Sequence, residues 1–255
     1  MTTQTLLITG AASGIGYGVA KAMANKGHNI IITDINQQRV DEALARLSQE
    51  GINATGYPLD VTSAEDLQRL MAKLETIKID VLINNAGIQH VSRLEDFPLD
   101  KWQLIVDILL LGPVRTCQQM LPKMRAQGFG RIINIGSIHG LVASPYKSAY
   151  VSAKHGLLGF SKVIALETAD TDITINTICP AYVKTALVEK QIADQAKQHG
   201  MSEAEVVDKI MLEPMPKKSF IDIEEIAHTV EFLASKQASN MTGQALVIDG
   251  GWTVK

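Results

Sequence analysis

The sequence predicts an α/β protein built on one doubly wound parallel sheet, with helices on both faces. Short apolar, β-branched runs alternate with longer segments of helical period, which is typical of βαβ units and a parallel sheet. Runs such as Ile30–Ile32 and Val81–Ile83 do not alternate with polar residues, as expected of strands that are covered on both sides.

About seven strands follow from this pattern. The first strand and helix are predicted over Leu6–Thr9 and Ile15–Lys26, and the second pair over Asn29–Thr33 and Gln37–Glu50. The other strands are predicted at Ala54–Leu59, Asp80–Asn84, Arg131–Ile135, Thr174–Ile178 and Ala245–Ile248, with periodic segments between them.

A single dinucleotide-binding catalytic domain is expected over residues 1–255, because no repeat or Pro/Ser-rich linker interrupts the alternation. A chain of this length can bury roughly 70–75% of its unfolded surface. The segment from Thr185 to Phe220 (185–220) is helical in pattern and charged, and it precedes the last helix and strand. We expect it to form a helical lid over a ligand; the alternative is a surface excursion without motion.

Charge and hydropathy exclude several partners. With 24 basic and 27 acidic residues and no basic stripe, the sequence predicts no nucleic-acid partner. The most apolar stretch, Leu104–Val114, is short and contains Asp107, Gly112 and Pro113, so no membrane span is expected.

The cysteine content points to a reducing compartment. Cys117 and Cys179 are too few for a disulfide framework, and no residue cluster has metal-ligand spacing. Residues Met1–Gln4 show no secretory signal, so we expect a cytoplasmic protein without a metal.

A glycine-rich turn follows the first predicted strand and opens the first helix. Its residues with predicted cofactor contacts are Gly10, Ser13, Gly14, Ile15 and Gly16. Glycines there let the backbone approach a pyrophosphate, which free N–H groups and the positive helix end then hold. A simple tight turn is the alternative interpretation.

The second predicted strand ends at Asp34, which lies 18 residues after Gly16, close to the spacing of an acid that binds the adenosine ribose. A carboxylate there accepts hydrogen bonds from both ribose hydroxyls and repels a 2′-phosphate, which favours NAD over NADP. Ser13 brings no positive charge to the turn, in agreement with NAD. Alternatively, Asp34 is a helix cap or a solvated turn residue.

Small and polar residues end the third and fourth predicted strands. Asp60 and Val61 suit the edge and face of an adenine, and Asn85, Ala86 and Gly87 would let the cofactor cross the sheet. Taken alone, either group is also ordinary turn chemistry.

A serine, a tyrosine and a lysine mark the predicted chemical end. Ser137 follows the fifth strand, and Tyr150 and Lys154 come 13 and 17 residues later, four apart on one helix face. A phenol has a pKa of about 10, so a base acting near pH 7 needs roughly 4 kcal/mol of preference for the phenolate. Lys154 and an oxidised nicotinamide could supply the positive potential. A surface Tyr/Lys pair is the alternative for these two residues alone.

Over its whole length the sequence resembles the short-chain dehydrogenase/reductase family. The resemblance rests on the Thr9–Gly16 turn, Asn84–Gly87, the set Ser137, Tyr150 and Lys154, and the segment Asn176–Thr185. It implies a Rossmann domain, usually in a homotetramer, in which Lys154 also binds the nicotinamide ribose. Pro180, Val183 and Thr185 would then lie at the nicotinamide end.

Two positions depart from the family pattern. Leu109 stands where the family usually has an asparagine that fixes a helix irregularity and a proton-relaying water, and Ala181 replaces a glycine. The relay therefore lacks its usual side chain, although a backbone carbonyl could still hold the water.

Four further polar residues indicate the substrate class. His139 and Lys147 are predicted to flank the reactive oxygen, Gln89 follows the turn at Asn84–Gly87, and Gln191 lies in the predicted lid. Donors of these kinds that converge on a small site suit a carboxylate. Tyr182 would form an aromatic wall beside it. Each residue also has an ordinary reading, as a solvated lysine, a packed histidine or polar surface.

The same set is similar to that of family members that oxidise (R)-3-hydroxybutyrate, in Gln89–His90, Ser137–Gly140, Lys147 and Leu187–Gln191. The implied activity is NAD-dependent, reversible oxidation of this acid to acetoacetate, with Tyr150 as general base and Ser137 polarising the substrate oxygen. The alternatives are a reductase for 3-oxoacyl or sugar substrates and a non-catalytic dinucleotide sensor, for which Leu109 is the best argument.

Overall fold

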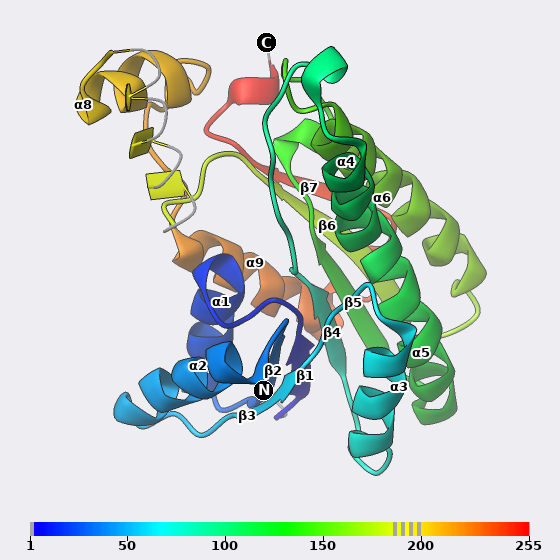
Figure 1. The fold of residues 1–255 in the computed structure, drawn as a ribbon. Coiled ribbons are helices and arrows are strands. Elements are labelled where there is room, and N and C mark those ends of the chain that lie inside the picture. The colour runs from blue at the N-terminus through cyan, green and yellow to red at the C-terminus, as the bar shows by residue number, and fades with distance from the viewer. Residues whose placement is uncertain (1–2, 186–187, 190–191, 194–195, 198–199, 255) are drawn as a thin grey trace.

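Seven strands form one sheet in the order β3-β2-β1-β4-β5-β6-β7, and every neighbouring pair is parallel. The computed structural model describes residues 3–185, 188–189, 192–193, 196–197 and 200–254. The strands are β1 (Thr5–Ile8), β2 (Asn29–Asp34), β3 (Thr55–Pro58), β4 (Val81–Asn84), β5 (Gly130–Ile135), β6 (Ile173–Pro180) and β7 (Ala245–Ile248). The predicted parallel α/β fold is confirmed (Figure 1).

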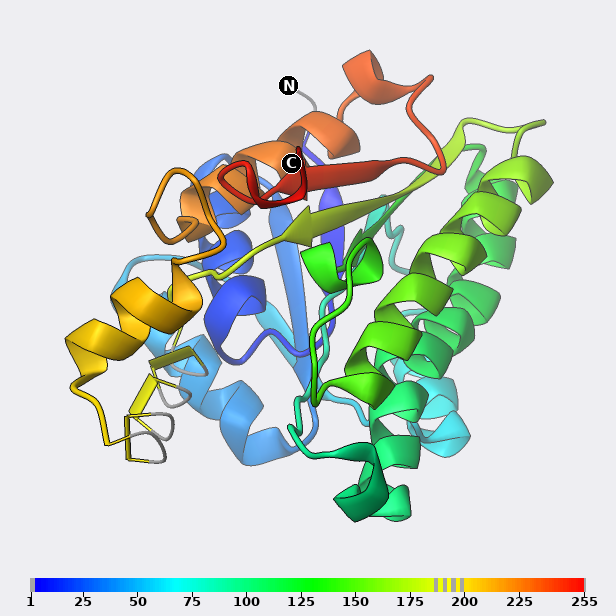
Figure 2. The ribbon, with the colours of Figure 1, turned by 90° about the horizontal axis from the view of Figure 1, so that it is seen from above.

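The helices lie on both faces of this sheet, as Figures 1 and 2 show. The α-helices are α1 (Gly14–Asn25), α2 (Gln37–Gln49), α3 (Ala64–Lys73), α4 (Leu99–Val106), α5 (Gly112–Gln127), α6 (Ser148–Glu167), α8 (Glu203–Val206) and α9 (Ile223–Ala234). Short helical turns are η1 (Leu94–Asp96), η2 (Asp107–Leu111), η3 (Ile138–Gly140), η4 (Val207–Met211), η5 (Lys236–Ala238) and η6 (Trp252–Val254). One hydrophobic cluster joins α1, α2 and α9 to the sheet, and another joins α3, α5 and α6 to the opposite face.

The uninterrupted apolar runs of the sequence serve these two clusters at once. Leu6 and Ile8 of β1 point into the cluster under α1, while Leu7 between them points into the cluster under α5. Ile30 and Ile32 of β2 likewise flank Ile31 on the opposite face. Side chains that alternate between two apolar layers leave no solvent face, so a central strand needs apolar residues at every position.

The helices α4, η2 and α5 form one continuous run over Leu99–Gln127. By length and composition alone this run could cross a membrane, with a mean hydropathy of 1.3 over its most apolar window. The sequence shows no unbroken apolar stretch over this run, because Asp107, Gly112 and Pro113 lie inside it. Cys117, Met120 and Met124 of α5 are buried on the sheet, as in a core helix.

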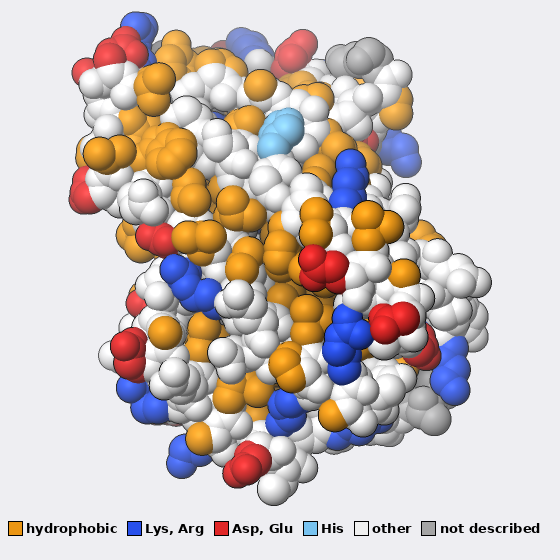
Figure 3. Space-filling model, turned by 90° about the vertical axis from the view of Figure 1, so that its right-hand side faces the viewer, with side chains coloured by type: hydrophobic (Ala, Val, Ile, Leu, Met, Phe, Trp, Pro, Cys, Tyr) orange, Lys and Arg blue, Asp and Glu red, His pale blue; other side chains and the backbone are white. Residues whose placement is uncertain are grey.

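Figure 3 shows apolar side chains gathered on the outer side of the helices that lie to the right in Figure 1. Leu104 of α4 and Val163 and Leu166 of α6 are exposed large apolar residues. Surfaces of this kind often mark contacts with another protein chain.

The segment 185–220 leaves the sheet after β6. Its described part contains α8 and η4, and α8 begins with a capping box in which Ser202 and Glu205 bond each other's backbone N–H groups. Val206 and Met211 are buried in a small apolar cluster of their own. Figures 1 and 2 show this part projecting from the body of the sheet.

A chain of buried polar side chains links β4, β5, β6, α5 and α6. Asn84 donates to Asn134 Oδ1 at 2.9 Å and accepts from Thr116 Oγ1 at 2.7 Å. Asn134 in turn donates to Ser161 Oγ at 3.0 Å, and Ser161 lies 3.0 Å from Thr177 Oγ1. Each member satisfies the next, so removing one leaves a buried partner without a hydrogen bond.

We therefore expect Asn134→Ala to lower the free energy of unfolding by about 2–4 kcal/mol, because it leaves a cavity and an unpaired amide on Asn84. Urea denaturation measures this change. Asn53→Ala, at an exposed asparagine, is the matched control and should change stability by less than about 0.5 kcal/mol. Equal effects of the two substitutions would contradict a structural role for the network.

Candidate active site

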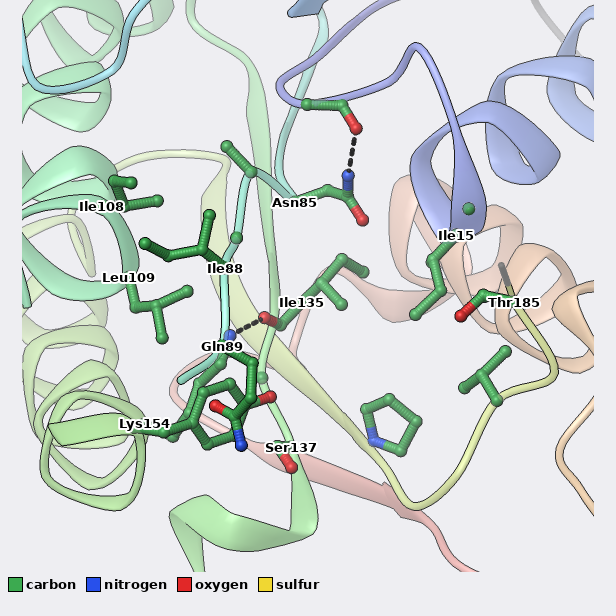
Figure 4. Close-up of a pocket in the computed structure, with 18 of the residues that line it drawn as sticks. Ile15, Asn85, Ile88, Gln89, Ile108, Leu109, Ile135, Ser137, Lys154 and Thr185 are labelled. Carbon is green, nitrogen blue, oxygen red and sulfur yellow. Dashed lines mark hydrogen bonds between the residues drawn. The ribbon is translucent and has the colours of Figure 1, made fainter. Parts of the chain in front are cut away.

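A cavity of about 440 Å³ lies at the carboxyl ends of the strands. Its wall runs from Asp34 at the end of β2 to Trp252 near the end of the described chain. The sheet order reverses between β1 and β4, and in open α/β sheets ligands bind at such a switch point. Figure 4 shows Ile15 and Thr185 toward one end of the cavity and Gln89, Ser137 and Lys154 gathered at the other.

The predicted glycine turn forms one wall of this cavity. Gly10 has a φ of +62° and Gly14 a φ of +59°, a region that residues with a Cβ rarely adopt. A Cβ on Gly10 would lie 2.6 Å from Ala86 Cα, and one on Gly16 would lie 2.4 Å from Asn85 Nδ2. Close packing thus excludes a side chain at Gly10 and Gly16, while Gly10 and Gly14 present bare backbone to the cavity beside the N-terminus of α1, which could hold a phosphate group.

Asn85 holds the glycine turn rather than only lining the cavity. Its Nδ2 donates to the carbonyls of Thr9 and Gly10, each at 2.9 Å, and the latter bond is drawn in Figure 4. The Thr9 hydroxyl oxygen accepts from the N–H groups of Asn85 at 3.0 Å and Ala86 at 3.1 Å. The loop after β4 therefore fixes the shape of the turn after β1.

Asp34, at the end of β2, lines the cavity, and its side chain is 7% exposed. It accepts hydrogen bonds from the N–H groups of Ala12 at 3.1 Å and Ile35 at 2.9 Å. Ser13 itself brings no charge, as the sequence shows, but the structure adds a positive charge from α2: Arg39 Nε is 3.2 Å from Asp34 Oδ1, and its guanidinium also donates to Ser13 Oγ at 3.3 Å. A residue on the next helix could only be placed once the helix direction was known.

Four more of the predicted cofactor residues line the same cavity: Asp60, Val61, Ala86 and Gly87. One carboxylate oxygen of Asp60 already accepts from the N–H of Thr62 at 2.8 Å and from its hydroxyl at 2.7 Å. The turn chemistry considered for Asp60 is thus present together with its place in the cavity wall.

At the other end the structure brings Ser137, Tyr150 and Lys154 together. Lys154 is 6% exposed; its Nζ donates to the carbonyl of Ile135 at 2.6 Å and lies 5.6 Å from the centre of the Tyr150 ring. Burial lowers the pKa of Lys154 to about 8. Ser137 Oγ accepts a hydrogen bond from the His139 N–H at 3.1 Å, which leaves its own hydroxyl hydrogen free to be donated to another group.

The mechanism predicted from the sequence requires a low pKa at the Tyr150 phenol, and the protein alone does not provide it. Burial raises the pKa of Tyr150, and the neighbouring Ser137 hydroxyl offsets only part of this rise. In the protein alone, Lys154 therefore does not make the phenol acidic.

Leu109 occupies the wall of the cavity next to Gly87, whose Cβ, if present, would lie 3.1 Å from Leu109 Cδ2. The helix is nevertheless irregular here: Asp107–Leu111 forms one π-helical turn, and the Gly112 N–H donates to the Asp107 carbonyl. The irregularity thus exists without an asparagine. π-Turns are frequent at functional sites.

The predicted carboxylate-binding residues Gln89, His139 and Lys147 also line this end of the cavity. Lys147 Nζ lies 3.3 Å from His139 Nε2, and burial together with this cation lowers the pKa of His139 to about 4. Burial also lowers the pKa of Lys147. His139 Nδ1 and Gln89 Oε1 are buried and have no hydrogen-bond partner among the described residues, so a ligand could satisfy them.

Aromatic rings close the same end, and one of them was missed. Tyr182 lies in the wall as expected, with its ring 5.9 Å from that of Trp252. Trp252 also makes an edge contact with His139 at 5.9 Å. Asp249 positions this tryptophan by accepting hydrogen bonds from Gly251 N–H and from both the N–H and hydroxyl of Thr253. Only an aspartate-glycine-glycine turn before Trp252 gives a sequence signal.

The last predicted site residues lie at the end of β6 and beyond it. Pro180 at the end of β6, and Val183 and Thr185 after it, line the cavity, and Val183 pairs with Ile221 in an isolated parallel bridge. Gln191 lies outside the described residues. In the part of the chain that the structure describes, no group of three His, Cys, Asp or Glu side chains could hold a metal ion.

Known proteins resemble this chain over its full length. The family profile described as enoyl-(acyl carrier protein) reductase matches residues 10–253. The D-beta-hydroxybutyrate dehydrogenases of Rhizobium meliloti (strain 1021) and Cupriavidus necator are each 42% identical, covering 99% of this chain and 100% and 98% of those proteins. The crystal structure of an actinorhodin polyketide ketoreductase variant with NADPH has a TM-score of 0.92 at 31% identity, covering 98% of this chain and 97% of that one. The chain therefore belongs to the short-chain dehydrogenase/reductase family.

Proposed function

We propose that this protein is an NAD-dependent dehydrogenase that oxidises (R)-3-hydroxybutyrate to acetoacetate reversibly. The observation that carries the proposal is the pairing of Lys147 and His139 in a half-buried wall beside Tyr150 and Ser137. An oxidoreductase of this family needs only the latter pair with Lys154, whereas a cation and an imidazole next to them suit a substrate that bears a carboxylate. The two 42% identical hydroxybutyrate dehydrogenases support this choice.

The cavity fits a nicotinamide dinucleotide, the cofactor that this family uses. In the proposal, the open backbone of Gly10 and Gly14 and the first turn of α1 hold the pyrophosphate, and Asp34 binds the adenosine ribose. When bound, the cofactor accepts a hydride and brings a positive charge in its oxidised form. Lys154 then binds the nicotinamide ribose, and Thr185 and the Val183 backbone face the carboxamide.

Proton transfer falls to Tyr150. Its phenol takes the proton of the substrate hydroxyl, while the Ser137 hydroxyl donates a hydrogen bond to the same oxygen as charge develops on it. Lys154 is buried below the phenol and stabilises the phenolate. In the protein alone, burial raises the pKa of the Tyr150 phenol. The phenolate would therefore be favoured only when the oxidised cofactor adds its positive charge to that of Lys154.

The substrate carboxylate would replace missing hydrogen bonds. Lys147 supplies the charge, and His139, whose pKa of about 4 keeps it neutral at pH 7, donates from the nitrogen that does not face Lys147. Gln89, and Gln191 from the segment 185–220, would supply amide donors. Tyr182 and Trp252 would pack on the substrate methyl group.

We also propose a lid, an assembly and a compartment for this protein. Segment 185–220 would act as a lid, since Val188 and Thr185 already line the cavity. Assembly as a homotetramer would cover the exposed apolar residues of α4 and α6. The protein would work in the cytoplasm, where both buried cysteines stay reduced.

A panel of short 3-hydroxy acids of both hands, assayed with NAD and with NADP, tests the activity. The fastest NADH formation should come from (R)-3-hydroxybutyrate, and Tyr150→Phe should lower kcat by roughly 10²- to 10⁴-fold, because the general base is lost. Tyr146→Phe, at an exposed tyrosine outside the cavity, is the control. A protein that only senses the dinucleotide would give no turnover and no difference between these variants.

Lys147→Ala should raise the KM for the acid by roughly 10²-fold or more, since a buried charge-assisted contact to the carboxylate disappears. The affinity for NAD should stay nearly unchanged, because Lys147 lies at the opposite end of the cavity from Asp34. Lys162→Ala on the exposed side of α6 is the matched control. Loss of acid and NAD binding together would count against the carboxylate role.

The neutral state of His139 can be tested through protein stability. Its pKa is about 4 in the folded protein and 6.5 ordinarily, so the unfolded chain binds more protons between these values. The contribution of His139 to stability is therefore lost as the pH falls from about 6.5 to about 4. We expect His139→Gln to reduce this loss in urea denaturation, whereas the exposed-site control His228→Gln should follow the wild type. Parallel curves for all three proteins would contradict a buried neutral imidazole.

A further inference from the structure

The two aromatic rings that close the substrate end of the cavity come from different parts of the chain. Tyr182 follows β6 and Trp252 follows β7, and their ring centres lie 5.9 Å apart. Trp252 also makes its edge contact with His139. Neither ring belongs to a strand residue, so the sheet alone does not fix the distance between the two rings.

A segment between η4 and α9, which we call the strap (Met215–Ile221), contacts the loops that carry both rings. The Lys217 N–H donates to the Gly250 carbonyl at 3.1 Å, in the loop after β7. The Ile221 N–H donates to the Tyr182 carbonyl at 2.9 Å, in the loop after β6. The strap, which the structure describes in full, is not itself part of the cavity wall. It can therefore act on a substrate only through the residues that it holds.

The strap packs closely on the two glycines that precede Trp252. A Cβ on Gly251 would lie 3.3 Å from Pro216 Cγ, and one on Gly250 would lie 3.2 Å from Met215 Cε. Met215 is completely buried, so this end of the strap is anchored in the main core. A side chain at Gly251 would push the strap and the turn before Trp252 apart.

The strap is also stiff, and it continues into the segment that projects from the sheet. The Lys218 N–H donates to the Met215 carbonyl at 2.9 Å and closes a β-turn, in which Pro216 takes the second position, where its fixed φ is favoured. Phe220 and Tyr182 pack against both the main core and the small apolar cluster of the segment 185–220. Figure 2 shows the strap, in orange, between this segment, in yellow, and the red end of the chain.

We propose that the strap is a positioning segment that sets the length of the hydroxy acid that the site accepts. It holds Trp252 and Tyr182 at a separation that admits the methyl group of a four-carbon acid and excludes a longer chain. A pocket of this kind discriminates a single methylene by roughly 10- to 200-fold. This inference rests on the proposed function and deepens it, because it assigns the limit on chain length to residues outside the cavity wall.

Steady-state kinetics of Pro216→Gly with (R)-3-hydroxybutyrate and (R)-3-hydroxyhexanoate tests the proposal. The substitution loosens the β-turn and removes the ring that contacts Gly251. It should raise the KM for the short acid by roughly tenfold, lower the preference in kcat/KM for the short over the long acid by roughly tenfold, and change kcat by less than about twofold. The dissociation constant for NADH, measured without acid, should stay within about twofold of the wild type, since no ring at the substrate end holds the cofactor in the proposed function.

Gly251→Ala disturbs the same contact from the other side and should lower the same preference. Gly251 has a φ of +91°, so this substitution also strains the backbone. The matched control is Gly27→Ala, where φ is +85° and a Cβ would meet no atom of the described structure within 4 Å. Both alanine variants should lose stability, whereas only Gly251→Ala should change the selectivity for chain length.

The position of Trp252 can be followed without any substrate, because the chain has two tryptophans, Trp102 and Trp252. In a Trp102→Phe background, quenching of fluorescence by acrylamide reports the access of solvent to Trp252 alone. Adding Pro216→Gly should raise the quenching constant by roughly twofold or more, as expected of a local opening. Adding Gly27→Ala should leave it unchanged.

The proposal is overturned if both strap variants keep the wild-type preference for the short acid, if Pro216→Gly leaves the quenching of Trp252 unchanged, or if Gly27→Ala has effects of equal size. Failure of the wild type to turn over any 3-hydroxy acid would instead contradict the proposed function, and the limit on chain length with it. The quenching measurement separates the two cases, because it tests whether the strap holds Trp252 without relying on activity.

Discussion

The site depends on one costly feature, an ammonium group buried at the end of β5. Lys154 is almost completely buried, and the Ile135 carbonyl is its hydrogen-bond acceptor. A buried cation needs such a partner, and burial lowers the pKa of this ammonium to about 8. Close packing holds it there: a Cβ on Gly140 would lie 2.9 Å from the Lys154 carbonyl oxygen, so only glycine lets η3 approach α6 this closely. That approach is what places Ser137 and His139 beside Tyr150.

The parallel sheet explains why two chemically different ends share one cavity. All strands have their carboxyl ends on one edge, so the loops after β1, β2 and β4 meet those after β5 and β6. The first group offers the glycine backbone and the Asp34 carboxylate paired with Arg39, which suit a phosphate-bearing nucleotide. The second group offers a phenol, a hydroxyl and two cations, which suit an alcohol that carries a negative charge. Within the first group, the hydrogen bonds of Asn85 to the carbonyls of Thr9 and Gly10 fix the loop after β4 against the turn after β1.

What the sequence predicted well is local. The glycine turn, Asp34 and the helical spacing of Tyr150 and Lys154 each depend on neighbours within one strand-helix unit, and strand positions agreed within one or two residues. Trp252 could not be predicted, because its place against His139 depends on how the chain folds back after β7. Arg39 was missed because a charge map of the sequence does not show which way a helix presents its side chains.

Helix regularity was the other limit. Leu109 put the usual proton relay in doubt, and the sequence did not show whether the helix irregularity would form; the π-turn over Asp107–Leu111 is present, which backbone hydrogen bonding alone can produce. The whole site depends on the buried Lys154 ammonium group, and NMR of the protein with ¹³Cε-labelled lysine tests for it most directly. One lysine resonance should titrate near pH 8 and be missing in Lys154→Met. Titration of every lysine near the ordinary value of 10.5 would contradict a buried ammonium at the centre of this site.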